Sequence, residues 1–231
     1  MGQGIPSEPF ILLNFKTYFE ATGKRAVDLS RRFETVSRNS GVRVGVAPQF
    51  CDIMPVASSV EIPVYAQHID PVPPGAFTGH ILGESVKAAG ASGTLLNHSE
   101  KTLRLIDIER SVELAREVGL QTIVCASTVR LAAAVALSEP DMVAIEPPEL
   151  IGSGRAVSKE RPEVVTESVE RIRAVNSRVK ILCGAGITTG DDVHAALKLG
   201  TQGVLVASGV VKAPKPEGVL MEFCNAVRKF I

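Results

Sequence analysis

Apolar residues gather along this chain in eight short runs, and a longer stretch with helical periodicity follows each run. The runs are rich in Val and Ile and do not alternate strictly with polar residues, which is typical of strands buried on both faces of a sheet. We therefore expect strands over residues 10–15, 42–47, 64–67, 93–97, 121–125, 142–146, 179–183 and 203–206.

The stretches between these runs predict helices, and some carry start or stop signals. Thr22 is a candidate N-cap for a helix that ends before Gly41, and Pro162 suits the first turn of a later helix. The expected helices cover residues 22–39, 53–59, 82–89, 102–118, 129–137, 162–175, 191–199 and 217–230. Eight strands, each followed by a helix, predict a (β/α)8 barrel of the α/β class that forms a single domain over residues 1–231.

A doubly wound open sheet is the alternative arrangement for such units. It favours a glycine-rich turn after the first strand, where a dinucleotide phosphate binds. In this chain Asn14, Phe15 and Lys16 stand there instead, which favours the barrel.

A long segment without helical or strand pattern, residues 68–79, interrupts the units and is rich in proline. Segments of this length within compact domains are often functional. Phe77 lies at its tip, where a monomer would leave the ring in water. We expect a contact between subunits at Phe77; the alternative is that the ring folds back on its own subunit.

Composition excludes several classes of function. The 231 residues include 25 Lys and Arg and 25 Asp and Glu, so the chain carries no net charge, which argues against nucleic-acid or membrane-surface binding as its main role. The four cysteines are far apart and form no CxxC or Cys/His pattern, so no metal site is expected. No apolar run approaches the roughly 18 residues of a membrane span. The first ten residues lack a secretion signal, so we expect a cytoplasmic protein.

Polar residues follow several of the expected strands. Asn14 and Lys16 follow the first strand, His98 and Glu100 follow the fourth, and Glu146 ends the sixth. In a (β/α)8 barrel the ends of the strands meet at one rim, where active sites lie. These side chains are therefore expected to come together, although each of them alone would more often be a surface or core residue.

The segment after Glu146 has the composition of a lid. Two prolines stiffen the exit from the strand, and the apolar pair Leu150 and Ile151 precedes Gly152 and Gly154. Glycine-rich turns also follow the seventh and eighth strands, where barrels of this kind often bind a phosphate through backbone N–H groups.

A carboxylate base, an imidazole, a cation and a phosphate cradle suit one type of chemistry. The base can remove a proton next to a carbonyl, and fixed donors can stabilise the enediolate that results. A lid would protect this intermediate from water. The sequence therefore predicts the isomerisation of a small phosphorylated aldose and ketose.

These motifs resemble those of the triosephosphate isomerase family. The resemblance rests on Asn14-Phe15-Lys16, on Asn97-His98-Ser99-Glu100, on the Glu146 lid, on the tip at residues 75–79 and on the turn at residues 184–186. It covers nearly the whole chain in order and spacing. The lid sequence after Glu146, the turn that follows Cys183 and the reduced length are similar to the shorter archaeal form of the family.

The resemblance implies a reaction and roles for individual residues. It implies interconversion of D-glyceraldehyde 3-phosphate and dihydroxyacetone phosphate in glycolysis and gluconeogenesis, without a cofactor or metal. The family is a well-known example of a glutamate base beside a neutral histidine electrophile, and these roles fall on Glu146 and His98. Lys16 would stabilise charge and Glu100 would hold it. The implied substrate contacts are Asn14, Phe15, Lys16, Ile151, Gly186, Ala207 and Ser208.

The resemblance also implies a homodimer or homotetramer, in which Phe77 and Thr78 enter the neighbouring subunit near Lys16 and His98. One departure from the commoner family pattern concerns the phosphate turn, where Gly186 stands at a position usually held by serine. The loss of that hydroxyl would leave more of the phosphate binding to backbone N–H groups.

Other functions remain open from the residues alone. A sugar-phosphate epimerase would need metal-binding His and Asp pairs at the rim, and an indole-forming synthase would need an additional lysine; neither is evident. A barrel that binds triose phosphates without turnover would be expected to lack a catalytic side chain. Asn14, Lys16, His98 and Glu146 are all present, which disfavours that alternative.

Overall fold

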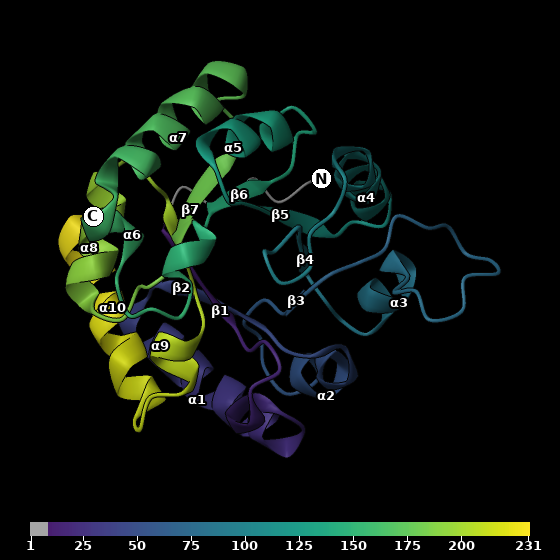
Figure 1. Cartoon of the computed structure of the whole chain (residues 1–231). Coiled ribbons are helices and arrows are strands. Elements are labelled where there is room, and N and C mark those ends of the chain that lie inside the picture. The colour runs from purple at the N-terminus through teal and green to yellow at the C-terminus, as the bar shows by residue number, and fades with distance from the viewer. Residues whose placement is uncertain (1–8) are drawn as a thin grey trace.

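The computed structural model describes residues 9–231, and within them eight parallel strands form one sheet (Figure 1). The order across the sheet is β2-β1-β8-β7-β6-β5-β4-β3. The strands are β1 (Phe10–Asn14), β2 (Arg43–Ala47), β3 (Tyr65–Ala66), β4 (Gly93–Leu96), β5 (Gln121–Ala126), β6 (Met142–Ile145), β7 (Lys180–Gly184) and β8 (Gly203–Val206). The expected (β/α)8 barrel is therefore confirmed.

A single bridge between Val46 and Val64 closes the barrel between β2 and β3. Strand β3 has only two residues, so this seam has far less ladder pairing than the joint between β1 and β2, where five residue pairs are in register. The expected strand over residues 64–67 was too long, because Val64 and Gln67 lie outside the regular ladder.

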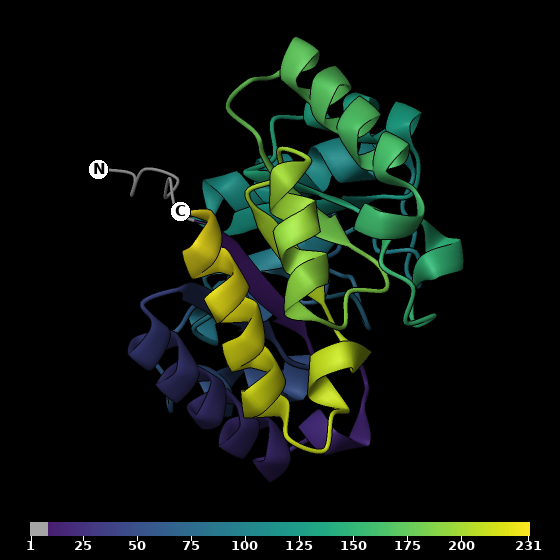
Figure 2. The same cartoon turned by 90° about the vertical axis from the view of Figure 1, so that its left-hand side faces the viewer.

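Helices surround the barrel, and Figure 2 shows α10 along the outside. They are α1 (Lys24–Ser40), α2 (Ile53–Ala57), α3 (Gly83–Ala88), α4 (Leu105–Glu117), α5 (Val129–Ala136), α6 (Val157–Glu160), α7 (Pro162–Val175), α8 (Gly190–Lys198), α9 (Ser208–Val211) and α10 (Pro216–Phe230). Three 3-10 turns join them: η1 (Phe19–Ala21), η2 (Phe50–Asp52) and η3 (Pro148–Leu150). None of the helices in the described part of the chain is long and apolar enough to cross a membrane.

Two of the three expected signals at helix ends are confirmed, and the third is wrong. Pro162 does begin α7, and the left-handed Gly41 ends α1. Thr22 is not the N-cap of α1: Gly23 holds that place, and the Thr22 hydroxyl donates to the Tyr18 carbonyl at 2.8 Å. The short helices α6 and α9 were not predicted, because four residues carry too little periodicity to detect.

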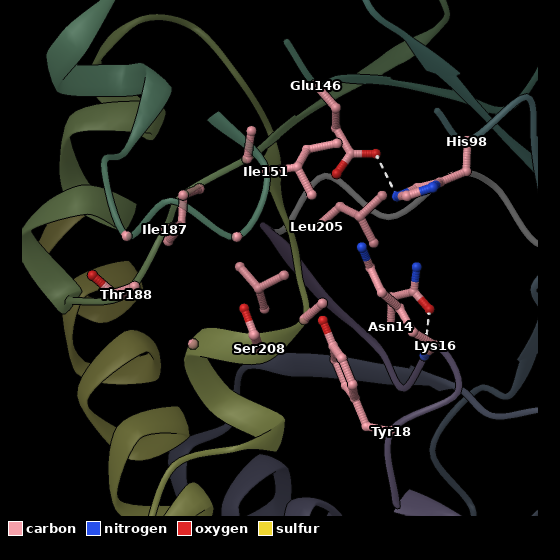
Figure 3. Close-up of a pocket in the computed structure, with 17 residues that line it drawn as sticks. Asn14, Lys16, Tyr18, His98, Glu146, Ile151, Ile187, Thr188, Leu205 and Ser208 are labelled. Carbon is pink, nitrogen blue, oxygen red and sulfur yellow. Dashed lines mark hydrogen bonds and ion pairs between the residues drawn. The ribbon is translucent and has the colours of Figure 1, made fainter. Parts of the chain in front are cut away.

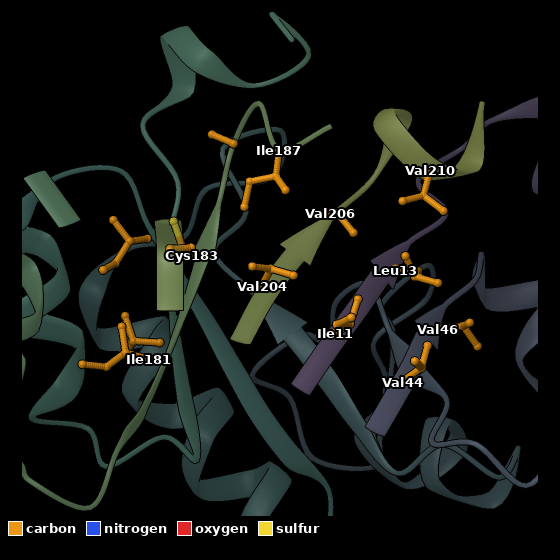
Figure 4. Close-up of a cluster of buried hydrophobic side chains, with 14 of the residues drawn as sticks. Ile11, Leu13, Val44, Val46, Ile181, Cys183, Ile187, Val204, Val206 and Val210 are labelled. Atoms are coloured by element: carbon orange, nitrogen blue, oxygen red, sulfur yellow. The ribbon is translucent and has the colours of Figure 1, made fainter. Parts of the chain in front are cut away.

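Apolar side chains fill two layers. Along β1, Phe10 and Leu12 belong to a cluster inside the barrel, whereas Ile11 and Leu13 belong to the layer between barrel and helices. Figure 4 shows this outer layer along β1, β2, β7 and β8. Successive side chains of a strand point to opposite faces, so a strand buried on both faces must be apolar throughout.

The irregular segment expected over residues 68–79 is present and projects from the barrel beyond β3 (Figure 1). Its base is held closed by two hydrogen bonds: Asp70 N donates to the Ile81 carbonyl at 2.9 Å, and Ile81 N donates to the Asp70 carboxylate at 2.6 Å. Phe77 is 40% exposed at the tip. Its ring lies edge-on to that of His80, with 5.7 Å between the centroids.

Candidate active site

A pocket opens at the C-terminal ends of the strands, and side chains from widely separated parts of the sequence line it (Figure 3). Eight of the predicted site residues line this pocket: Asn14, Lys16, His98, Glu146, Ile151, Gly186, Ala207 and Ser208. The rim of the barrel therefore brings the proposed base, electrophile, cation and phosphate contacts to one cavity.

Lys16 follows β1 in a conformation that is unusual for a residue with a side chain. Its φ of 46° lies in the left-handed region, and its backbone N–H donates to Asn14 Oδ1 at 2.9 Å. Its ammonium group donates to Glu100 Oε1 at 2.7 Å. Backbone strain of this kind is retained where the surroundings enforce it, often at functional sites. The arrangement directs a nearly buried cation to the pocket.

His98 lies just after β4, on a turn that Asn97 holds in place. The Asn97 side chain donates to the Cys125 carbonyl and accepts from Leu103 N, both at 2.9 Å. Glu100 N donates to His98 Nδ1 at 3.2 Å. An Nδ1 that accepts a hydrogen bond carries no proton, so a neutral His98 has its proton on Nε2. This nitrogen is the one that faces Glu146 (Figure 3).

Glu146 directly follows β6 and is 6% exposed. Burial raises the pKa of its carboxyl group, because the charged form loses its hydration; His98, Cys125 and Lys16 act in the opposite direction. Its Oε2 is buried and has no hydrogen-bond partner among the described residues. A carboxylate with few hydrogen bonds in a dry site is a stronger base than one in water.

Two glycines provide space that this arrangement requires. A Cβ at Gly184 would lie 2.5 Å from Cγ of Glu146, so the glutamate packs against bare backbone of β7. At Gly186, where φ is 71°, a Cβ would overlap the carbonyl of Arg155 at the end of the lid. Val157 N also donates to the Ala185 carbonyl at 3.2 Å. The end of the lid therefore rests directly on the turn after β7.

The lid itself begins with Pro147 and the 3-10 turn η3. Leu150 is buried, and its carbonyl accepts a hydrogen bond from Ser153 Oγ at 2.7 Å. Outside the pocket, Arg161 pairs with the Glu149 carboxylate at 2.9 Å. These contacts hold Ile151 and Gly152 at the pocket wall.

Backbone N–H groups on the other side of the pocket suit a phosphate. Helix α9 begins at Ser208, and its first internal hydrogen bonds run from Val210 and Val211 to the Ala207 carbonyl. The N–H groups of Ser208 and Gly209 come before these donors, so the helix itself does not use them. Both residues line the pocket together with Gly186 and Ile187.

Four predicted residues lie elsewhere. Phe15 does not line the pocket: it is fully buried in the outer apolar layer, 6.2 Å from the ring of Phe33. Glu100 lies behind Lys16 with a side chain that is 60% exposed. Phe77 and Thr78 lie at the exposed tip of the irregular segment and do not line the pocket.

The pocket also contains residues that the sequence did not single out. Leu205 comes from β8, where the alternation of inward and outward positions was a signal that could have found it. Tyr18 and Thr188 come from turns, whose side-chain directions follow no simple period. Within residues 9–231, no group of three or more His, Cys, Asp or Glu side chains is placed to hold a metal ion.

Comparison with known proteins agrees with this geometry. The family model described as triosephosphate isomerase matches residues 9–227. A triosephosphate isomerase from Methanosarcina acetivorans is 55% identical over 219 residues, which are 95% of this chain and 99% of that protein. The one from Methanocaldococcus jannaschii is 51% identical over 217 residues, 94% of this chain and 99% of its own length.

A crystal structure of triosephosphate isomerase from Bartonella henselae has the same fold, with a TM-score of 0.75 over 96% of this chain and 99% of that one. Its sequence identity of 18% supports the fold alone. The match to the family model, over residues 9–227, includes β1 to β8 and every residue that lines the pocket. The chain therefore belongs to the triosephosphate isomerase family.

Proposed function

We propose that this chain is a triosephosphate isomerase that interconverts D-glyceraldehyde 3-phosphate and dihydroxyacetone phosphate, with Glu146, His98 and Lys16 as its catalytic residues. The observation that carries the proposal is the pocket in which a desolvated carboxylate, an imidazole with Nε2–H and a lysine ammonium face one space. Membership of the family supplies the substrates.

In this mechanism Glu146 removes a proton from the carbon next to the carbonyl. The electron pair left on that carbon forms the carbon–carbon double bond of an enediolate, and the carbonyl oxygen takes the negative charge. His98 Nε2–H donates to that oxygen and moves a proton between the two oxygens. Glu146 then returns its proton to the neighbouring carbon, so that no atom is gained or lost.

Lys16 and Asn14 support this chemistry through charge and position. The ammonium of Lys16 stabilises both the enediolate and the substrate phosphate, and Glu100 keeps it directed at the pocket. The cradle around Gly186, Ala207 and Ser208 holds the phosphate, and Ile151 covers it when the lid is in place. Phe15 contributes through packing below Lys16, not through a side-chain contact with substrate.

We further propose that residues 9–231 form one catalytic domain, that the protein acts in the cytoplasm in glycolysis and gluconeogenesis, and that it associates as a homodimer or homotetramer. Residues 1–8 of the domain expected over residues 1–231 lie outside the described part of the chain. The exposed Phe77 and Thr78 at the tip of the projecting segment support the association, because a neighbouring copy would remove the ring from water.

A coupled assay of the purified protein with D-glyceraldehyde 3-phosphate tests the reaction. The same turnover in D2O tests the mechanism, because a proton held by a carboxylate exchanges with solvent. Deuterium should appear on a product carbon. Turnover without any deuterium would contradict the enediolate, and absence of turnover by the folded protein would contradict the function.

A further inference from the structure

Tyr18 lies in the pocket wall two residues after Lys16, and no role follows for it from the mechanism above. Its backbone is held on both sides: Tyr18 N donates to the Phe15 carbonyl at 3.2 Å, and the Tyr18 carbonyl accepts from Thr22 Oγ1 at 2.8 Å. The residue directly precedes η1. The direction of its half-buried side chain is therefore set by the local fold.

The ring lies on the phosphate side of the pocket. Lys212, the residue that follows α9, places its ammonium 5.4 Å from the centroid of the Tyr18 ring. Ala207 and Ser208, at the other end of α9, line the same pocket as Tyr18. Figure 3 shows the hydroxyl end of Tyr18 directed into the pocket, toward the side where Ser208 lies.

The hydroxyl group of Tyr18 has no hydrogen-bond partner within residues 9–231, although it is a good donor. Other hydroxyl donors on this side are few, and Ser208 is one of them. Thr188 directs its hydroxyl at Asp192, 3.4 Å away, and Gly186 has no side chain and no room for one. A phosphate bound in the cradle would thus meet a free phenol hydroxyl.

We propose that the Tyr18 hydroxyl donates a hydrogen bond to the substrate phosphate and makes the enzyme selective for phosphorylated trioses. The proposal rests on the function proposed above. Gly186, after β7, has no hydroxyl group to offer the phosphate. Tyr18, after β1, would supply a hydroxyl donor from another part of the rim. The acceptor is an anion, so the hydrogen bond is charge-assisted. Its loss should therefore weaken binding of the phosphorylated substrate.

The variant Tyr18→Phe tests the proposal because it keeps the ring and removes only the hydroxyl. We expect KM for D-glyceraldehyde 3-phosphate to rise roughly tenfold with little change in kcat, as for a hydrogen bond to a charged group that is made equally in the ground and transition states. With D-glyceraldehyde, which has no phosphate, kcat/KM should not change.

Tyr65→Phe is the matched control, since Tyr65 is the other of the chain's two tyrosines. Its hydroxyl donates to Gln121 Oε1 at 2.6 Å, at the opposite, N-terminal end of the strands. KM for D-glyceraldehyde 3-phosphate should be unchanged in this variant.

An unchanged KM in Tyr18→Phe would overturn the proposal. An equal loss with the phosphorylated and the unphosphorylated substrate would also overturn it, because the effect would then be structural. If the wild type proves inactive, the proposed isomerase function fails separately. Titration calorimetry with inorganic phosphate then decides the role of Tyr18: weaker binding to Tyr18→Phe than to the wild type supports it, and equal or absent binding overturns it.

Discussion

Oε2 of Glu146 lies 3.7 Å from Nε2 of His98, although the two residues follow strands that are not neighbours in the barrel. Strand β5 lies between β4 and β6, and both side chains are nearly buried. The distance is too long for a hydrogen bond. Each side chain is therefore available to the substrate: His98 Nε2 to its carbonyl oxygen, and the Glu146 carboxylate to the neighbouring carbon.

Replacement of Glu146 by glutamine should abolish most of the turnover while the phosphate cradle remains intact. Loss of a positioned general base typically costs about 10²–10⁴-fold in rate. We expect kcat to fall within or beyond this range, and inorganic phosphate to bind as before in calorimetry. Glu113→Gln, on the exposed side of α4, is the control and should keep full activity. Near-normal turnover in Glu146→Gln would remove Glu146 from the mechanism.

The same variant should be more stable than the wild type at neutral pH. Burial raises the pKa of Glu146 above its ordinary value of 4.5, so the folded protein holds this proton more tightly than the unfolded chain does. Stability is therefore lost as pH rises from the ordinary to the raised pKa, and the wild type carries the full penalty above both.

Glutamine removes that penalty, so the melting temperature at pH 7.5 should rise above that of the wild type. At a pH below 4 both proteins carry a neutral side chain there, and the difference should shrink. A variant that melts below the wild type at pH 7.5 and above it at pH 4 would reverse the expected sign.

Gly184→Ala and Gly186→Ala should change different kinetic constants: the first should lower kcat, and the second should raise KM. A Cβ at position 184 meets Glu146, so the base must move, and displacements near 1 Å can cost about 100-fold in rate. A Cβ at position 186 meets the Arg155 carbonyl, so the lid end and the phosphate turn must separate and KM should rise. Gly218→Ala, where the nearest atom is 3.8 Å away, is the control. Identical kinetic effects from both pocket variants would contradict this division.

Glu100 should matter for catalysis more than for stability. Its ion pair with Lys16 is 2.7 Å long, but the carboxylate side is 60% exposed, and pairs of that kind contribute about 0–1 kcal/mol. Glu100→Gln should therefore melt close to the wild type, while a less constrained Lys16 raises KM and lowers kcat, together about tenfold in kcat/KM. The readout is steady-state kinetics beside a thermal melt. A large stability loss with unchanged kinetics would show that the pair is structural.

The projecting segment should carry a subunit contact. Phe77→Ser should shift the protein toward monomers in sedimentation velocity and reduce activity, because the neighbouring tip is expected to support Lys16 and His98. Phe230→Ser alters a ring of similar exposure, 43% against 40%, at the end of α10 and should leave the oligomer intact. A wild type that sediments as a monomer at micromolar concentration would contradict the proposed assembly.

The sequence predicted the barrel well because strands buried on both faces must be apolar throughout, as in β1 and β8. Catalytic candidates were found because parallel strands end at one rim. Side-chain direction beyond a strand end was not predictable: Phe15 turns into the core, whereas Tyr18, three residues later, turns into the pocket. The placement of Thr22 was missed because Gly23, with φ of 62°, offers the helix a start without a side-chain cap.

The pairing of β1 with β8 has a consequence for synthesis of the protein. Asn14 and Lys16 leave the ribosome long before the cradle residues Ala207 and Ser208, because almost two hundred residues separate them in the sequence. Until β8 emerges, β1 has a partner on one edge only, and the cation and the cradle belong to separate parts of an unfinished sheet. The rim that carries the proposed site is thus assembled by closure of the ring, so an incompletely made chain lacks the complete set of proposed site residues.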